Sequence, residues 1–394
     1  MTLPHIYVPE KYMSRYALLQ AFCVEFGEAA REAGHVVNPD RNEASGAAPA
    51  IFLVFNFPES MERILKWMGP RTGPTAMVQW LVDHPFNLDK ALMADMVKQG
   101  GYRFVHVTDD DSHMLQLRWP GLRHGRVWHG VPRSALCDAA SVAASHLDGS
   151  RDGSRDGYRD IDVFFAGSIA DDAELDRLRA DMPTELHAKC DDVAKLRLEY
   201  PWLSFGQAFD SIMPTPLTCS DHWGLLAVVF RYSTAKLNRE RRIRLVQSLA
   251  GLRVCVAGSA VWKGLLPAGC EYVGEVPYTD ISAWMRRTKV CVALNPTQFV
   301  HGFSERLLLS MAGGCATVTD DRLWVRENFT NPNVRAAVGF GVNQPGQLRD
   351  CVHTLLADAS ARAEIAMRGR ALVEEKHLWV HRVKSLLRVV GMGG

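Results

Sequence analysis

Arg306 stands two residues after Ser304, where a polar loop that contains Gly302 passes into a helical pattern. A guanidinium offers a planar fork of N–H donors that matches the oxygens of a phosphate group. The first amides of a helix have no partner within the helix, so they add further donors for an anion. The pattern predicts a phosphate site, unless Glu305 and Arg306 simply form a solvated ion pair on a structural unit.

The surrounding residues predict the elements that must position this loop. Residues 289–294 form an apolar run typical of a buried parallel strand, and Asn295-Pro296 predicts the turn that ends it. Ser304 is placed to cap the helix that follows. Residues at helical spacing form its apolar face: Leu307, Leu308, Met311 and Ala312. Gly313-Gly314 ends the helix before a strand at 315–319, and in open α/β sheets such a loop binds anions.

Short matches to a known family run through this segment: Leu294-Asn295, Gly302, Arg306, Ala312-Gly313-Gly314 and Thr319-Asp320. On these residues the segment resembles the donor-binding segment of GT-B glycosyltransferases, in their family 1-type carboxyl-terminal domains. It is most similar to the spore-maturation-type (CgeB-like) enzymes of bacteria. The resemblance runs from about residue 231 to residue 390 and more weakly through the amino-terminal half.

The resemblance implies an α/β protein of GT-B architecture: two facing Rossmann-like domains with parallel sheets and a carboxyl-terminal helix that crosses back. The expected order is an amino-terminal acceptor domain at 1–165, a helical connection at 166–230, a nucleotide-sugar domain at 231–375 and a bracing helix at 376–394. The repeated Ser-Arg-Asp-Gly unit within 148–160 predicts a flexible surface insertion.

Composition is that of an ordinary globular protein of two domains, with 394 residues, 47% of them hydrophobic and 23% charged. The net charge of +1 favours no nucleic-acid partner, and no apolar run approaches the ~20 residues of a membrane span. The first residues lack the features of a signal peptide, so a cytoplasmic enzyme is expected, and the resemblance implies a bacterial one. The nine cysteines show no metal-binding spacing, so no metal is expected. The resemblance implies a nucleotide sugar as co-substrate and no further cofactor.

The amino-terminal domain has predicted strands at 5–8, 51–57, 76–82, 104–108 and 126–128, and its alternation with helices predicts a parallel sheet. Polar side chains follow the carboxyl ends of these strands. Asp83 and His84 are the candidates for a catalytic base or sugar clamp. Further acceptor-side candidates are Asp111, His113 and His129. The alternatives are a strand-end turn for the first pair and a helix cap or metal site for residues 109–111.

On the donor side, the resemblance implies that Arg306 and the backbone amides of Gly302 to Glu305 bind the diphosphate of a UDP-, GDP- or dTDP-linked sugar. Gly258-Ser259 is the matching loop after a strand at 253–257, and Glu305 is the candidate for the ribose hydroxyls. The sequence departs from the family at one point. The two glutamates that the commonest retaining members carry fall at His301 and Leu309, which leaves the stereochemical outcome open.

Four further residues have two interpretations each. His301 either hydrogen-bonds the donor or is an ordinary loop histidine. Asn295 is either a turn former or a polar contact at the strand end. Arg231 and Lys236 lie in the basic half of a helix predicted at 222–249, and they either reach the cleft or lie on a solvated face.

These features predict a metal-independent glycosyltransferase that moves a sugar from a nucleotide diphosphate to a hydroxyl of a glycan, a protein or a small molecule. An arginine and helix amides can stabilise the diphosphate leaving group without a metal. Two alternatives share the fold: a sugar-nucleotide 2-epimerase-like enzyme, and a GT-B domain that binds a partner without turnover. An NAD-dependent enzyme is disfavoured because no Gly-x-Gly-x-x-Gly follows an early strand.

Overall fold

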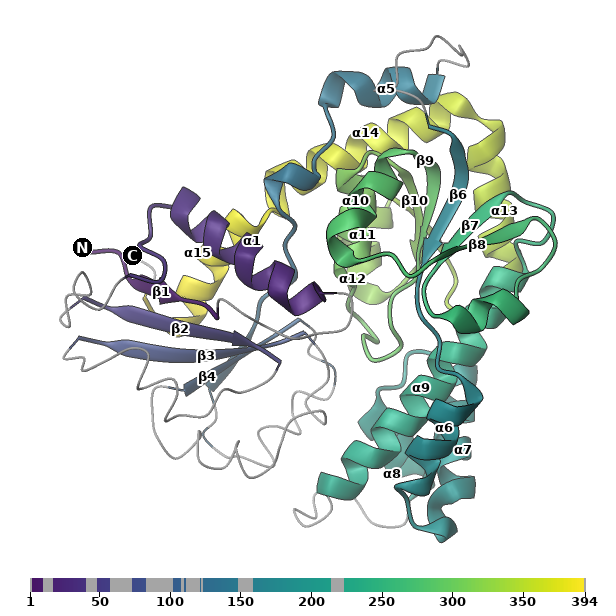
Figure 1. The fold of residues 1–394 in the computed structure, drawn as a ribbon, viewed down its shortest axis with the longest axis horizontal. Helices are drawn as coiled ribbons and strands as arrows, with labels where there is room; N and C mark the ends of the chain where they lie inside the picture. Colours follow the sequence, from purple (N-terminus) through teal and green to yellow (C-terminus); the bar gives the residue numbers. More distant parts are fainter. Residues whose placement is uncertain are drawn as a thin grey trace. The chain divides into compact units, whose positions relative to one another are not determined.

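The structure of this protein is a computed structural model (Figure 1). It describes residues 2–9, 17–39, 48–56, 73–82, 102–107, 110, 121, 123–147, 159–213 and 223–392. The chain divides into two compact units. Unit 1 comprises Met1–Pro132, Leu217–Ala227 and Leu378–Gly394, and unit 2 comprises Arg133–Pro216 and Val228–His377.

Unit 1 is built on a five-stranded sheet in the order β1-β2-β3-β4-β5, and every neighbouring pair is parallel. The strands are β1 (His5–Tyr7), β2 (Ala50–Phe55), β3 (Thr75–Leu81), β4 (Tyr102–His106) and β5 (Arg123–Arg126). Strand β2 is buried along its whole length because a parallel sheet covered by helices exposes neither face. The parallel sheet predicted for this half of the chain is confirmed.

The carboxyl-terminal helix α15 (Trp379–Val390) returns to unit 1 and packs against α1 (Leu18–Glu32). The chain enters this helix beside β5: Leu378 pairs with Val131 in a parallel bridge, and the Trp379 amide donates to the Val131 carbonyl at 3.0 Å. A Cβ on Gly130 would lie 2.8 Å from the Trp379 Cα, so only glycine allows this approach. The predicted return of the last helix is therefore confirmed.

Trp379 is the centre of an aromatic cluster within unit 1. Its ring centroid lies 5.2 Å from that of Phe22, 5.7 Å from that of Trp80 and 6.4 Å from that of Phe55. Its indole N–H donates to Glu25 at 2.7 Å, so the buried polar atom is satisfied. Side-chain packing therefore joins the last helix of the chain to the first sheet.

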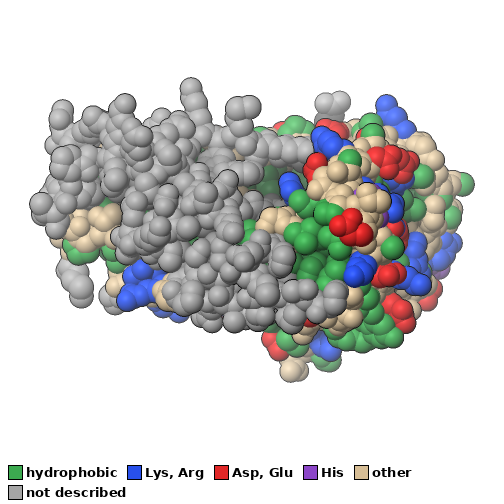
Figure 2. Space-filling model, turned by 90° about the horizontal axis from the view of Figure 1, so that it is seen from below, with side chains coloured by type: hydrophobic (Ala, Val, Ile, Leu, Met, Phe, Trp, Pro, Cys, Tyr) green, Lys and Arg blue, Asp and Glu red, His purple; other side chains and the backbone are tan. Residues whose placement is uncertain are grey.

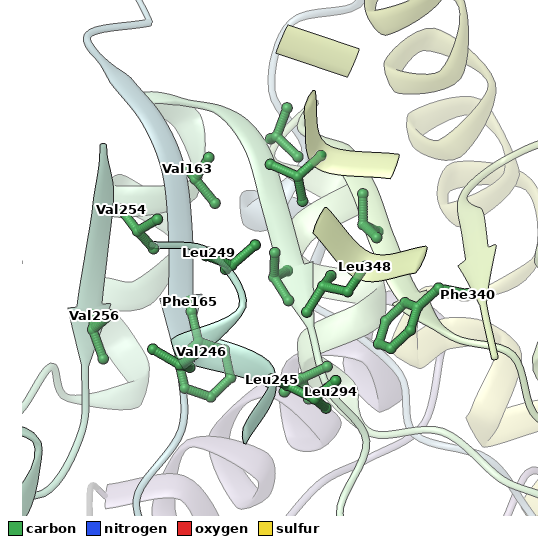
Figure 3. Close-up of a cluster of buried hydrophobic side chains, with 14 of the residues drawn as sticks. Val163, Phe165, Leu245, Val246, Leu249, Val254, Val256, Leu294, Phe340 and Leu348 are labelled. Carbon is green, nitrogen blue, oxygen red and sulfur yellow. The ribbon is translucent and has the colours of Figure 1, made fainter. Parts of the chain in front are cut away.

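Unit 2 contains a six-stranded parallel sheet in the order β11-β10-β9-β6-β7-β8. The strands are β6 (Ile161–Ala166), β7 (Val254–Ala257), β8 (Cys270–Gly274), β9 (Thr288–Ala293), β10 (Ala316–Asp320) and β11 (Val338–Phe340). Apolar side chains from this sheet meet those of flanking helices in one core, which includes Phe165, Val256, Leu245 and Leu348 (Figure 3). The α/β fold class with two parallel sheets is confirmed.

The helices of unit 2 include α5 (Ala139–Leu147), α6 (Asp172–Ala180), α7 (His187–Glu199), α8 (Phe205–Ile212), α9 (Trp223–Gln247), which begins in unit 1, α10 (Tyr278–Arg286), α11 (Glu305–Ala312) and α12 (Leu323–Val325). A π-helical turn (Arg326–Thr330), α13 (Pro345–Ala357) and α14 (Ala359–Lys376) complete them. The helix α14 is capped by Asp358, whose carboxylate accepts the Ala361 amide.

Strand β6 corrects the predicted division of the chain. The range 1–165 assigned it to the first domain, but β6 pairs with β7 and β9 at the middle of the second sheet. The helices α6 to α9 are consequently an insertion between two neighbouring strands of unit 2 and not only a connection between domains. Periodicity identifies a strand but does not say which sheet it joins.

On the face drawn in Figure 2, basic and acidic side chains of the described residues are interspersed, in keeping with the net charge of +1. Among the described residues, no helix is both long enough and apolar enough to cross a membrane. The predicted insertion at 148–160 falls mostly outside the described residues.

We expect Trp379→Ala to lower the free energy of unfolding by about 3–5 kcal/mol, because it empties a packed aromatic site. Urea denaturation followed by circular dichroism measures the change. Trp202→Ala is the matched control, since Trp202 is 62% exposed while Trp379 is 1% exposed. Equal stability of the two variants would contradict the bracing role of α15.

Candidate active site

Strands β7, β6, β9 and β10 lie side by side in this order in the second sheet, and each neighbouring pair is parallel. Their carboxyl ends therefore lie at the same edge of the sheet. The loops that leave this edge begin at Gly167, Gly258, Leu294 and Asp321. The carboxyl edge of an open α/β sheet is where ligands bind in this class of fold. Most of the donor-side residues predicted from the sequence lie on or beside these loops, and Arg231 and Lys236 are the exceptions.

Gly258 is held against the loop that follows β6. Its φ of 145° and a Cβ position only 2.4 Å from the Gly167 carbonyl oxygen exclude any larger residue. Its amide donates to the Gly274 carbonyl at 3.0 Å, and its own carbonyl accepts the Tyr272 hydroxyl at 3.0 Å. The predicted Gly258-Ser259 loop therefore lies at the sheet edge, packed directly on its neighbour.

Ser259 uses its hydroxyl within the protein. The oxygen donates to the Ile169 carbonyl at 2.7 Å and accepts the Ile169 amide at 3.0 Å, and the residue is 5% exposed. These two bonds fix the loop after β6 to the loop after β7. The side chain is thus a positioning group for these two loops.

Asn295 organises the loop between β9 and α11. Its side-chain oxygen accepts the Ser304 amide at 2.9 Å, and its side-chain nitrogen lies 3.2 Å from both Thr319 Oγ1 and Asp320 Oδ1. Its backbone amide also donates to Asp320 Oδ1, at 2.8 Å. The residue is 1% exposed, and it makes the polar strand-end contact that was one of its two predicted roles.

Asp320 is fully buried at the end of β10 and is paired with two arginines. Arg241 Nη2 lies 2.9 Å from Asp320 Oδ2, and Arg322 Nε makes a short contact with the same oxygen. Burial alone would raise the pKa of Asp320, but the two guanidinium groups outweigh burial and lower this pKa to about 2. The carboxylate is therefore ionised at neutral pH, and it is outnumbered by the cations around it.

Arg241 and Arg242 are consecutive residues of α9 that bind different loops of this edge. Arg241 Nη1 donates to the Asn295 carbonyl at 2.9 Å, whereas Arg242 Nη1 donates to the Ser168 carbonyl. Burial lowers the pKa of Arg241 to about 10 and, together with the charges of Arg306 and Arg241, lowers that of Arg242 to about 9. Mutual repulsion of these buried cations favours an anion nearby.

Arg231 and Lys236 lie on the same basic helix, α9, and were predicted either to reach the cleft or to lie on a solvated face. Lys236 Nζ pairs with Asp191 of α7 at 2.6 Å, and Tyr232 donates to the same carboxylate. Arg231 is exposed, as the solvated-face interpretation predicts, whereas Lys236 makes a local ion pair that neither interpretation described.

Arg306 extends from the first turn of α11 to the end of β6. Its Nη1 donates to the Ala166 carbonyl at 3.0 Å, and its Nε lies 3.5 Å from Glu305 Oε1. The structure describes no partner for Nη2, and the side chain is 21% exposed. The amides of Glu305 and Arg306 belong to a first helical turn, so they have no intrahelical acceptor. Donors therefore gather where the sequence predicted a phosphate.

Ser304 is the residue that precedes α11, but its side chain does not cap the helix. Its Oγ is buried and makes no hydrogen bond with any described residue. Asn295 supplies the acceptor for the Ser304 amide instead. The predicted capping bond is therefore wrong, although the predicted helix start and its end at Gly313-Gly314 are correct.

The other predicted donor residues lie on the loop before α11. His301 is partly exposed, its carbonyl accepts the Trp324 amide at 3.0 Å, and its ring centroid lies 6.4 Å from that of Trp324. Gly302 is buried. Glu305 is 8% exposed beside Arg306, and Leu309 is buried in the apolar face of α11.

Most acceptor-side candidates fall outside the described residues: Asp83, His84, Asp111 and His113. His129 is described, and it is buried in unit 1 with its ring centroid 5.6 Å from that of Phe22. Arg382 Nε donates to its carbonyl at 2.7 Å. The acceptor-side assignment of His129 is corrected, because this residue belongs to the core beneath α15.

Four residues of this edge were missed as site residues: Arg241, Arg242, Asp320 and Arg322. The adjacent arginines were visible in the basic half of α9, and Asp320 was part of the motif match. What the sequence does not show is that α9 lies against β9 and β10, so that residues about 80 positions apart form one charged cluster.

Residues 239–388 match the model of the glycosyl transferase-like family. This match covers the part of unit 2 from α9 to α14 and most of α15. A search of curated protein sequences gives no match.

Solved structures of several glycosyltransferases are similar to this chain in fold. Anabaena HepE in complex with UDP-glucose matches with a TM-score of 0.48 and 10% identity over 99% of this chain and 99% of that chain. WaaG, a glycosyltransferase involved in lipopolysaccharide biosynthesis, matches with a TM-score of 0.48 and 10% identity over 98% and 100%. T4 phage β-glucosyltransferase matches with a TM-score of 0.42 and 11% identity over 99% of each chain. These likenesses decide nothing about the substrate.

We expect Asp320→Asn to lower the free energy of unfolding by about 3–5 kcal/mol at pH 7, because it leaves two buried arginines without their carboxylate. The folded-state pKa of about 2 lies below the ordinary 3.8, so the wild-type contribution is complete above about pH 4 and is lost towards pH 2. Urea denaturation at pH 7 and pH 3 measures both effects.

Asp321→Asn is the control for this experiment. Its carboxylate pairs with Arg326 at 2.9 Å, and that arginine is 62% exposed, so the loss is expected to be small. An Asp320→Asn variant that keeps wild-type stability, or whose stability falls as steeply in acid as that of the wild type, would contradict the assigned role.

Proposed function

We propose that this protein transfers a sugar from a nucleotide diphosphate to a hydroxyl acceptor, with the diphosphate at the carboxyl edge of the second sheet. The observation that carries the proposal is the position of Arg306. It lies at the amino end of α11, contacts the end of β6 and adds its charge to that of buried Arg242. Such fixed donors stabilise negative charge without rearranging during the reaction.

The proposed roles follow from how each side chain is held. Arg306 binds the diphosphate through its Nη2, beside the free amides of the first turn of α11. Arg242 fixes the loop after β6 and contributes positive potential. Glu305 stands next to Arg306 and is the candidate for the ribose hydroxyls, while His301 faces the donor sugar or a phosphate.

The leaving group of this reaction is a nucleoside diphosphate, which gains charge as the glycosidic bond breaks. The buried cations and helix amides supply that stabilisation, so we propose a metal-independent reaction with UDP, GDP or dTDP as the leaving group. The nucleotide sugar is a co-substrate and no further cofactor is proposed. The acceptor is a hydroxyl of a glycan, a protein or a small molecule.

We expect UDP at millimolar concentration to raise the melting temperature of the wild-type protein and Arg306→Ala to abolish this rise, because a ligand stabilises only through the contacts it makes. Thermal shift and calorimetric titration measure the effect, with GDP and dTDP as parallel ligands. Arg253→Ala is the matched control, since its side chain is 81% exposed. An unchanged UDP response in Arg306→Ala would overturn the proposed position of the diphosphate.

The same titration separates the two alternative functions. A protein that shows no shift with any nucleotide or nucleotide sugar would be a binding domain without turnover. Conversion of a nucleotide sugar into its 2-epimer without an acceptor, followed by proton NMR, would show epimerase activity instead.

Asp83 and His84, which lie outside the described residues, are kept as the proposed acceptor base or sugar clamp. We expect Asp83→Asn to retain the UDP shift and to lower the transfer rate by about 10²-fold or more, as the loss of a general base does. The measurement is release of UDP in the presence of an acceptor, once one is found. Full transfer by Asp83→Asn would remove Asp83 from this role.

A further inference from the structure

A pocket opens on unit 2 on the β10–β11 side of Asp320, away from Arg306. It is a small hollow that is partly open to solvent. The lining residues come from α7 and the turn after it, from α9, and from the loops after β9, β10 and β11: Arg197, Pro201, Leu237, Arg241, Thr297, Arg322, Val342 and Asn343. Arg241 and Arg322 belong to the charged cluster around Asp320, but none of the lining residues is among those proposed to contact the diphosphate directly.

Three buried arginines give this pocket its charge. Arg197 and Arg241 are each 3% exposed, and Arg322 is 5% exposed. Arg241 and Arg322 share the single carboxylate of Asp320, so that group of three carries a net positive charge. Buried charge of one sign is costly unless an opposite charge is near, which makes the pocket a place for an anion.

Two hydrogen-bond donors among the residues that line the pocket have no acceptor among the described residues. They are Arg241 Nε and Thr297 Oγ1, and both are buried. The Arg197 guanidinium is held beside them, since its Nη2 donates to the Thr297 carbonyl at 2.7 Å. Buried donors of native proteins are nearly always satisfied, so a ligand that accepts from both fits what the protein presents.

One acceptor points to the kind of anion. Asn343 Nδ2 donates to the Leu198 carbonyl at 2.6 Å, and its side-chain oxygen is buried with no hydrogen-bond partner among the described residues. Hydrogen phosphate and phosphate monoesters accept from guanidinium groups and, when protonated, can also donate through their own hydroxyl. Sulfate and chloride have no such hydroxyl at neutral pH.

We propose that this pocket is a second anion site, specific for a phosphate group and distinct from the diphosphate site at Arg306. The consecutive residues Arg241 and Arg242 separate the two sites, because Arg241 faces Asn295 and Asp320 while Arg242 faces the loop after β6. The phosphate is either free or carried by a sugar. The exposed aromatic pair of Tyr200 and Trp202 flanks Pro201 of the pocket and offers faces for a sugar ring.

The test is a thermal-shift titration with inorganic phosphate, against potassium chloride and potassium sulfate at equal ionic strength. We expect phosphate to raise the melting temperature more than either salt. Thr297→Val removes one donor without loss of volume or of any existing hydrogen bond, and it is expected to weaken phosphate binding about tenfold. Arg197→Gln is expected to abolish it, while the exposed-site control Arg253→Gln leaves it unchanged.

The diphosphate site is tested in the same series, so the two proposals can fail separately. Arg306→Ala should lose the UDP response and keep the phosphate response, whereas Thr297→Val should keep the UDP response. A phosphate shift that is absent, equalled by sulfate, unchanged in Thr297→Val or lost in Arg306→Ala would overturn the second site.

A hexose phosphate distinguishes the two sources of the phosphate group. Tighter binding than that of inorganic phosphate, with the gain lost in Trp202→Ala, would assign the pocket to a phosphorylated sugar. Equal binding of the two ligands would assign it to the free anion.

Discussion

The edge of the second sheet depends on one buried carboxylate. Asp320 accepts from the Asn295 amide and pairs with Arg241 and Arg322, and Asn295 in turn holds the amide of Ser304 at the start of α11. The end of β10, the loop after β9, the helix α9 and the position of α11 are thereby joined through one charged group. Because Asp320 is fully buried, these bonds are made in a low-dielectric environment where each depends on the others.

The same arrangement explains why the site is cationic. A single carboxylate cannot neutralise the arginines that the fold brings to this edge, and the pKa of Arg242 is lowered by burial and by its charged neighbours. Several of these guanidinium groups donate hydrogen bonds to backbone carbonyls. Arg306 donates to Ala166, and Arg242 donates to Ser168. They hold the loops in place while their charge remains available to a ligand, which is the preorganisation that charge stabilisation requires.

The helical insertion between β6 and β7 gives unit 2 a second place to bind. It brings Arg197 of α7 and Arg241 of α9 to the loops after β9 and β10. A plain crossover helix between these strands would reach one side of the sheet edge only. The insertion therefore extends the cationic edge beyond the part used by a nucleotide diphosphate, and it accounts for buried donors that the rest of the fold leaves without partners.

The amino-acid sequence by itself determined the strand–loop–helix–strand unit around Arg306 and the two parallel sheets, because local periodicity and glycine punctuation encode them. It did not determine that β6 joins the second sheet, that His129 belongs to a core, or that Asn295 rather than the Ser304 side chain serves the start of α11. Those outcomes depend on contacts between residues far apart in the chain. Only the tertiary structure brings Arg241 to Asp320. These two residues are far apart in the sequence, so their ion pair depends on how α9 packs against the sheet and not on a local sequence pattern.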